Sequence, residues 1–438
     1  MPAGLDAQVI AVVADAADRL RNPDTVARAW AAARAQTAFP RSVNRDPLSL
    51  AQGEAGIALT CSFLDECFPD KGWDRTGRHY LSVAASHAEA RWDISTGLFS
   101  GVAGLGFAAF SLSRNGTRYR RLLASVDEAL IPRVAARARR LGRVTREGIP
   151  VGDFDLISGL AGTGAYLLCR VADPGAAEAL EVTLRCLVTL CRDIDGRPRW
   201  WTPARFMGDE DTAARYPDGY LNCGLAHGIP GPLALMAIAL AAGVRVSGLA
   251  EAVNCAASWL IEHRADDAWG VNWPVAVCLA PDGSTKPPGS DRPPTRSAWC
   301  YGAPGVARAL WLAGAALDRP AWRALAVEAM EAVYQRPDTI RSIDSPTFCH
   351  GAAGLLQVTL RFAHDTGLPS FAAEAVRLVQ SLLSAFEPDS MLGFRNLEPG
   401  GRRIDQPGLL DGSPGVLLAL TAAARNVEPC WDRAFLLA

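Results

Sequence analysis

The segment FCHGAAGLLQVTL, residues 348–360, combines a Cys-His pair, a Gly-x-x-G step and an apolar run. Such a run has the composition of a buried helix, and glycines at its start let the backbone turn sharply and neighbouring segments pack closely. A single Gly-x-x-G step is ordinary turn chemistry. Its meaning depends on whether the pattern recurs.

The pattern occurs seven times along the chain. Each copy opens a nearly uncharged apolar run, and the first glycines are 48–74 residues apart. An interval of ~50 residues holds two helices of ~15–20 residues with their connections. The copies are LAQGEAGIAL (50–59), LFSGVAGLGFAAF (98–110), LISGLAGTGAYLL (156–168), LAHGIPGPLALMAIAL (225–240), WCYGAPGVARALWLAG (299–314), FCHGAAGLLQVTL (348–360) and LLDGSPGVLLALTAA (409–423).

Amphipathic segments lie between the apolar ones. Residues 121–141 and 320–336 carry arginines and glutamates that suit a solvated outer face. An open solenoid of helix pairs needs polar caps at its ends, and neither end of this chain resembles one. We therefore predict an all-α fold, a seven-fold α/α toroid of seven inner and seven outer helices, with residues 1–438 as a single domain. Long loops near 193–222 and 280–298 are candidates for a functional role.

The composition narrows the class of protein. The chain has 438 residues, of which 49% are hydrophobic and 21% charged, and a formal net charge of -2, so no basic field indicates a nucleic-acid partner. Residues 1–22 form an amphipathic pattern without the basic start of a signal peptide, and no apolar run reaches the ~18 residues of a membrane span. These features predict a cytoplasmic protein. Most of the eleven cysteines, including Cys61, Cys169, Cys186 and Cys278, lie in apolar stretches and are expected in the core, not in disulfides.

The two residues before the first glycine depart from the repeat in three copies. They are Ala226-His227, Cys300-Tyr301 and Cys349-His350. Because equivalent positions of inner helices converge at one end of a barrel, Cys300, Cys349 and His350 are expected to meet. Two thiolates and one imidazole leave the fourth zinc position open, as in catalytic zinc sites. The alternative is that these residues are buried cysteines and a histidine at the start of a helix.

Three motifs carry a resemblance to a known family. WCYGAPG (299–305), CHG (349–351) and GLAHGIPG (224–231) together resemble the lanthionine synthetase C-like family, the lanthipeptide cyclases, and the resemblance spans all seven repeats. It implies a seven-fold α/α toroid with one catalytic Zn²⁺. It also implies the addition of a peptide cysteine to dehydroalanine or dehydrobutyrine in the same peptide.

The resemblance also implies roles for four further residues. His227 matches an acid/base residue and Asp155 an aspartate that orients the histidine or the substrate, although Asp153 is close by and a helix-capping role is the alternative. Arg296 matches an arginine of the catalytic centre, with a salt bridge or loop anchor as the alternative. Tyr301 would donate a hydrogen bond to the enolate, or else serve in packing.

A stand-alone cyclase requires partners. The resemblance implies a dehydrated precursor peptide with a leader, a separate dehydratase and a transporter, in a biosynthetic complex peripheral to the membrane. Two other functions remain open: a thiol transferase that adds glutathione or a similar thiol to dehydroamino acids in proteins, and a non-catalytic zinc-stabilised scaffold. A glycosidase or prenyl-transfer enzyme would need paired carboxylates or an Asp-rich diphosphate site, which the motifs lack.

Two residues near the repeats are placed outside the predicted site. Cys223 and Asp411 also precede Gly-x-x-G steps, but they match none of the family's ligand positions, and Cys223 is expected in the core. Some family members carry a β-rich insertion in the toroid. Only the long loops near 193–222 and 280–298 could hold a reduced version of it.

Overall fold

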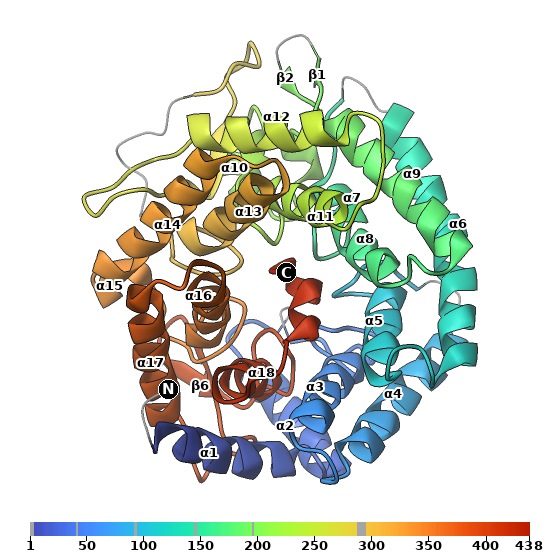
Figure 1. Ribbon diagram of the computed structural model, residues 1–438, viewed down its shortest axis with the longest axis vertical. Coiled ribbons are helices and arrows are strands. Elements are labelled where there is room, and N and C mark those ends of the chain that lie inside the picture. Colours follow the sequence, from blue (N-terminus) through green and yellow to red (C-terminus); the bar gives the residue numbers. More distant parts are fainter. Residues whose placement is uncertain (1–3, 41–42, 92–93, 144–146, 195–196, 287–294) are drawn as a thin grey trace. The chain divides into compact units, whose positions relative to one another are not determined.

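The computed structural model describes all residues except 1–3, 41–42, 92–93, 144–146, 195–196 and 287–294 (Figure 1). Each of the seven Gly-x-x-G steps opens a buried helix, as the repeat predicts. The first glycine is the N-cap in six copies, whereas the fourth helix begins two residues after Gly228. These inner helices are α3 (Glu54–Cys67), α5 (Val102–Leu112), α8 (Leu160–Cys169), α11 (Pro230–Ala241), α13 (Ala303–Ala316), α16 (Ala352–Thr366) and α18 (Ser413–Ala424).

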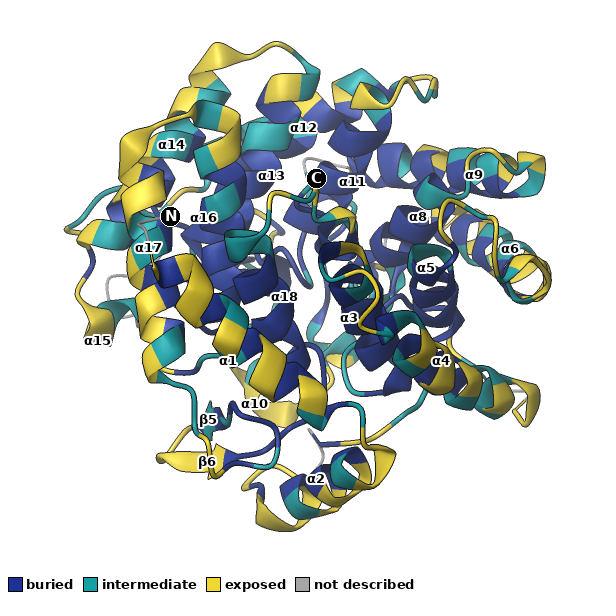
Figure 2. Cartoon of the chain, turned by 60° about the horizontal axis from the view of Figure 1, so that its bottom comes forward, coloured by how far each residue is buried: buried dark blue, intermediate teal, exposed yellow. Residues whose placement is uncertain are grey.

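The helices of a second set, two of which precede α3, have one exposed face, whereas the inner helices are buried almost all round (Figure 2). Residues 121–141 and 320–336 fall in two of these outer-type helices, as predicted. The set is α1 (Leu5–Arg19), α2 (Pro23–Gln36), α4 (Trp73–Glu89), α6 (Arg120–Arg143), α9 (Pro174–Leu190), α12 (Leu249–Glu262), α14 (Pro320–Gln335) and α17 (Pro369–Ser384). None of the helices in the described residues is long and apolar enough to cross a bilayer.

The remaining elements are short. Three two-stranded antiparallel sheets pair β1 with β2, β3 with β4, and β5 with β6. The strands are β1 (Asp193–Ile194), β2 (Arg197–Pro198), β3 (Tyr220–Asn222), β4 (Ala276–Cys278), β5 (Asn396–Glu398) and β6 (Arg402–Ile404). The short helices are α7 (Val151–Phe154), α10 (Glu210–Arg215), α15 (Asp338–Arg341) and the 3-10 turns η1 (Ala204–Phe206) and η2 (Cys430–Phe435).

The chain forms two compact units. In the first unit the inner helices pack in the order α5, α3, α18, α16, and in the second unit in the order α8, α11, α13. Inner helices pair with the helix that follows them, as in α3 with α4 and α13 with α14. The first unit comprises Met1–Ser95, Phe99–Val126 and Ser342–Asp432, and the second comprises Thr96–Leu98, Asp127–Arg341 and Arg433–Ala438.

The first and last repeats are neighbours within the first unit. Helix α18 packs against α3, and α1 packs against α18 as its outer partner. A Cβ on Gly56 of the first repeat would lie 3.0 Å from the Cβ of Leu409, which precedes α18. The outer helix of the last pair is therefore supplied by the start of the chain.

The Gly-x-x-G glycines are required by close backbone approach. Gly302 has φ +92°, and a Cβ there would lie 1.9 Å from the carbonyl oxygen of Arg296. A Cβ on Gly305 would lie 2.3 Å from the carbonyl oxygen of Trp299 and 2.8 Å from the Cβ of Leu225 in the preceding repeat. The first glycine thus allows the turn, and the second allows adjacent repeats to touch.

Backbone hydrogen bonds join the segments that precede neighbouring inner helices, which we term lead-in segments. In the second unit, Leu156 N donates to Ala226 O over 3.1 Å and Ala226 N to Cys300 O over 3.3 Å. In the first unit, Cys349 N donates to Leu410 O over 2.9 Å. These bonds fix the level at which the residues before each inner helix lie.

The two long loops predicted from the sequence contain short elements. The loop at 193–222 holds β1, β2, η1, α10 and β3, and β3 pairs with β4, placing Asn222 opposite Ala276. In the loop at 280–298, residues 287–294 lie outside the described residues. In the described second unit the strands are β1 to β4, and β4 lies just before the loop at 280–298.

The cysteines predicted for the core are at least partly buried. Cys61 and Cys186 are buried, Cys169 and Cys278 are half-buried, and no disulfide joins cysteines of the described residues. Burial raises the pKa of the Cys223 thiol to about 12, which suits the core position predicted for this residue.

Candidate active site

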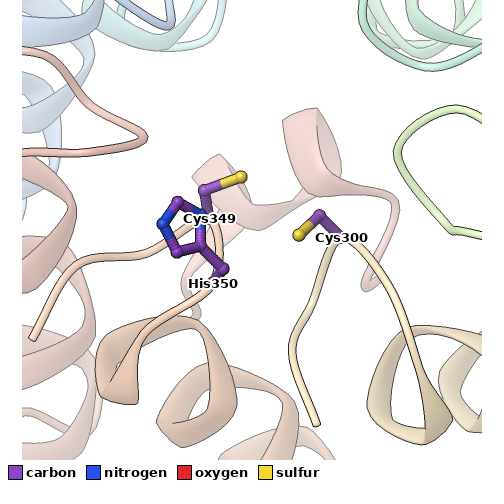
Figure 3. A group of neighbouring side chains, drawn as sticks. All are labelled: Cys300, Cys349 and His350. Atoms are coloured by element: carbon purple, nitrogen blue, oxygen red, sulfur yellow. The ribbon is translucent and has the colours of Figure 1, made fainter. Parts of the chain in front are cut away.

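Cys300, Cys349 and His350 form a cluster of metal-ligating side chains. One potential ligand atom from each residue lies within 4.8 Å of the other two. Figure 3 shows the three side chains on the loops that lead into α13 and α16. The structure thus brings together the three residues predicted from the repeat register. Two sulfur ligands and one imidazole nitrogen are a donor set that fits Zn²⁺ with one position left for a substrate.

The lead-in segment of Cys300 is anchored on both sides. Cys300 is 6% exposed, and its carbonyl oxygen accepts the hydrogen bond from Ala226. The preceding side chain, Trp299, is fully buried, and its indole nitrogen donates to the carbonyl oxygen of Phe435 over 3.1 Å. The backbone of Cys300 is therefore held at its own carbonyl oxygen and at the preceding residue.

Asp411, which we had placed outside the site, lies beside His350. The distance between Asp411 Oδ1 and His350 Nδ1 is 3.8 Å. Carboxylates near the second ring nitrogen of a metal-ligating histidine orient the ring and set its tautomer. Asp411 thus lies next to the metal-ligating cluster, although the sequence did not predict it as part of the site. Its position directly before Gly412 is equivalent to that of His350 before Gly351, and this shared register was the sequence signal.

His227 and Asp155 form a hydrogen-bonded pair in the second unit. His227 Nδ1 lies 2.6 Å from Asp155 Oδ2, while Asp155 Oδ1 accepts from the backbone N–H groups of Ser158 and Gly159, each over 2.8 Å. Asp155 is 1% exposed, whereas the His227 side chain is 39% exposed. The carboxylate holds a proton on Nδ1 and leaves Nε2 for other contacts. Asp155 thus both caps the turn before α8 and orients the histidine.

The neighbouring Asp153 has a different environment. Its Oδ1 lies 2.9 Å from Arg140 Nη2 and 3.7 Å from Arg137 Nε. The choice between the two aspartates, which the sequence left open, is therefore resolved geometrically: Asp155 contacts His227, and Asp153 contacts arginines of α6.

Tyr301 lies close to His227. Their ring centroids are 6.4 Å apart, and the Tyr301 hydroxyl accepts a hydrogen bond from Asn222 Nδ2 over 3.1 Å. Burial raises the pKa of Tyr301 well above its usual range, and the hydrogen bond from Asn222 opposes part of that increase. The phenol is therefore protonated at neutral pH and has an O–H to donate.

Arg296 is half-buried in the lead-in segment of α13. Its carbonyl oxygen is the atom that excludes a side chain at Gly302. Within the described residues, its guanidinium makes no hydrogen bond to His227, Asp155 or Tyr301. The structure therefore groups Asp155, His227 and Tyr301, and within the described residues no hydrogen bond joins the Arg296 guanidinium to them.

Two groups of side chains thus stand before the inner helices, the Cys300–Cys349–His350 cluster and the His227–Asp155 pair. Residues 45–436 match the family model described as lanthionine synthetase C-like protein, so the chain belongs to this family. It is 24% identical over 398 residues to the nisin biosynthesis protein NisC of Lactococcus lactis subsp. lactis, covering 89% of each chain.

A solved structure shows the same fold. The structure of a nisin cyclase matches with a TM-score of 0.75 and 23% sequence identity, covering 89% of this chain and 92% of that chain. The shared fold is an α/α toroid. The fold class predicted from the seven repeats is therefore confirmed.

Proposed function

We propose that this protein is a zinc-dependent lanthipeptide cyclase. It would form (methyl)lanthionine thioether rings by adding a peptide cysteine to dehydroalanine or dehydrobutyrine in the same dehydrated precursor peptide. The observation that carries the proposal is the Cys300–Cys349–His350 cluster in a chain of the lanthionine synthetase C-like family. The nisin cyclase fold supports it.

Zinc held by Cys300, Cys349 and His350 would supply the stabilisation that keeps the substrate sulfur as a thiolate, because a free thiol of pKa ~8.5 is mostly protonated at neutral pH. The sulfur lone pair forms a bond to the β-carbon of the dehydroamino acid. The electron pair of the carbon–carbon double bond moves toward the carbonyl oxygen and gives an enolate.

His227, held by Asp155, would transfer the proton between the thiol and the enolate. Since Asp155 holds Nδ1–H, Nε2 of the neutral imidazole accepts the proton that the thiol loses, and the buried carboxylate stabilises the imidazolium. The imidazolium then returns a proton to the α-carbon of the enolate. No atom is gained or lost, so the cyclised peptide has the mass of the dehydrated one.

Tyr301 and Arg296 would stabilise the developing negative charge. The Tyr301 ring lies near that of His227, and its hydroxyl would donate a hydrogen bond to the enolate oxygen. Arg296 lies in the lead-in segment four residues before Cys300, and its guanidinium would contact the substrate carbonyl or the peptide. A separate dehydratase would supply the dehydrated peptide and a transporter would export the product.

The test uses zinc-loaded protein and synthetic dehydrated peptides in which dehydroalanine and cysteine stand at several spacings, with and without an N-terminal leader. After incubation, free thiols are alkylated and counted by mass spectrometry. Loss of alkylation without a change in peptide mass supports the cyclase. Undiminished alkylation with every peptide contradicts it, and a mass increase that requires added glutathione indicates a thiol transferase instead.

A further inference from the structure

Asn222 is a buried polar residue at the end of β3, five residues before His227. It is 5% exposed, and its backbone is fixed because its carbonyl oxygen accepts from Ile229 N over 3.2 Å. The following residue, Cys223, donates its N–H to Val275 O over 2.9 Å. The side chain of Asn222 therefore starts from a rigid position.

The orientation of the Asn222 amide follows from its partners. Gly224 N–H can only donate, and it lies 2.9 Å from Oδ1, so this oxygen is the acceptor. The other end of the amide is then the NH₂ group, which donates to the Tyr301 hydroxyl oxygen over 3.1 Å. Tyr220 also interacts with this amide through its hydroxyl. The bond from Gly224 thus fixes the direction of the hydrogen bond between Asn222 and Tyr301.

The orientation of the Asn222 amide determines where the Tyr301 hydroxyl can donate its proton. A phenol has one O–H and accepts through its oxygen lone pairs. Because the Asn222 NH₂ can only donate here, the Tyr301 oxygen accepts, and the O–H cannot be used toward Asn222. The proton of Tyr301 is therefore free to point to another acceptor.

The ring of Tyr301 is held by the same segment. A Cβ on Gly224 would lie 2.5 Å from Tyr301 Cε1 and 2.8 Å from Cys300 O, so only glycine lets the ring lie flat there. His227 follows three residues later, with its ring centroid 6.4 Å from that of Tyr301. The segment 222–227 thus sets the ring plane of Tyr301, the direction of its hydrogen bond and the place of the imidazole.

We propose that Asn222 is a positioning residue that makes Tyr301 a hydrogen-bond donor toward the reacting group. The inference rests on the proposed cyclase function, and it assigns to Asn222 the polarity of the Tyr301 hydroxyl. An aspartate at this position has the same shape but accepts on both oxygens. It would keep the bond from Gly224 N and take the Tyr301 proton, so the donor would turn away from the substrate.

The test compares Asn222→Asp, Asn222→Ala, Tyr301→Phe and the double variant Asn222→Asp/Tyr301→Phe in the alkylation assay. Removing one donor from an oxyanion site lowers kcat by roughly 100-fold, so Asn222→Asp and Tyr301→Phe are each expected to lose about that much with little change in KM. The double variant should lose no more than Tyr301→Phe alone. Asn222→Ala, which frees the hydroxyl to rotate, should lose about 10-fold.

Asn272→Ala is the matched control. Asn272 is also a buried asparagine of the second unit, is 4% exposed, and accepts from a backbone N–H through Oδ1, but its NH₂ contacts Asp267. It should reduce the melting temperature as Asn222→Ala does and leave kcat unchanged. Zinc content should stay at the wild-type level in all of these variants.

A spectroscopic readout separates positioning from folding. The C–O stretch of a tyrosine shifts to lower frequency when its hydroxyl changes from acceptor to donor, and subtracting the Tyr301→Phe spectrum isolates Tyr301. Asn222→Asp should show this downward shift. Wild-type kcat in Asn222→Asp or Asn222→Ala, with Tyr301→Phe impaired, would overturn the role of Asn222 and leave the cyclase intact. If Tyr301→Phe is as fast as the wild type, the role of Asn222 is rejected and the cyclase function stands. If the wild type forms no rings, both are rejected.

Discussion

The lead-in segments of α3 and α16, both in the first unit, share a backbone and differ in chemistry. Each ends in a glycine N-cap whose Cβ would collide with an earlier carbonyl oxygen, at 1.9 Å from Asp46 O for Gly53 and 2.3 Å from Ser345 O for Gly351. Before Gly53 stands Gln52, which accepts from Asn44 N over 2.8 Å and serves its own loop. Before Gly351 stands His350, a member of the metal-ligating cluster.

The difference shows that the glycines and the backbone hydrogen bonds of the lead-in segments hold the repeat together. The side chain before the first glycine can therefore vary. The first repeat uses this position to fix a loop. The fourth to seventh repeats place His227, Tyr301, His350 and Asp411 there. Chemistry can therefore be added to the repeat without a change of its scaffold.

The largest expected effect comes from removing a metal ligand. Cys349→Ala should abolish stoichiometric zinc binding and lower cyclisation by at least ~1,000-fold, because two ligands leave the ion weakly held. Zinc is measured by elemental analysis after dialysis, and activity by thiol alkylation. Cys186→Ala, which removes a buried thiol of α9, should keep the metal. Full zinc content in Cys349→Ala would show that the cluster is not the metal site.

The next effect separates chemistry from metal binding. His227→Ala should lower kcat by ~100- to 10,000-fold and retain zinc, because the imidazole acts on protons and is not a ligand. Asp155→Asn should lower kcat by roughly 100-fold, since the amide no longer holds the proton on Nδ1. The kcat of each variant is measured as the rate of cyclisation at saturating peptide. Loss of zinc from His227→Ala would contradict the division of roles.

Breaking the shared scaffold should reduce stability in both segments. Gly53→Ala and Gly351→Ala should each lower the free energy of unfolding by about 3 kcal/mol through the backbone collision. Only Gly351→Ala should also weaken zinc binding. The control is Gly142→Ala in α6, where a Cβ would meet nothing within 4 Å. Denaturant unfolding measures all three, and equal zinc affinity in both scaffold variants would argue against a chemical difference between the segments.

A smaller effect is expected from the neighbour of the metal ligand. Asp411→Asn should weaken zinc affinity about 10- to 100-fold, because it loses the charge that orients His350. Competition with a chromogenic chelator gives the affinity. The equivalent change in the first repeat, at Gln52, serves as the control for loop stability.

The smallest effect completes the comparison. Gln52→Ala should cost about 1 kcal/mol of stability, since one backbone N–H loses its acceptor, and should leave zinc affinity and kcat as they are. Thermal unfolding and the alkylation assay check both parts. A change in kcat would show that the first repeat contributes to the site.

Much of the fold could be predicted because the Gly-x-x-G step has a local cause. In five copies a Cβ on the second glycine would touch the lead-in segment of the neighbouring inner helix, so the recurrence of this glycine reports helix packing directly. What could not be predicted is that α1 is the outer partner of α18, since pairing between the two ends of a chain leaves no mark on either segment.

The site was predictable where it follows the repeat register and unpredictable where it depends on side-chain direction. Cys300 and Cys349 occupy equivalent positions of neighbouring repeats and His350 follows Cys349, so a cluster could be inferred. The choice between Asp153 and Asp155 depends on side-chain direction, because Asp153 lies in α7 and contacts Arg140, whereas Asp155 follows α7 and contacts His227. Asn222 belongs to no motif that we recognised in the sequence. Its role depends on the orientation of its side-chain amide, which only the structure shows.

The packing of α1 against α18 has a consequence for how the protein is made. Helix α1 is synthesised before the seven inner helices, and its partner α18 is the last of these, so its packing partner is absent while the other six are made. During that time the apolar face with Val9 and Val13, which is buried in the folded protein, is uncovered. Early folding can begin with local pairs such as α3 and α4, whereas the pairing of the two ends is the slow, long-range step that comes last.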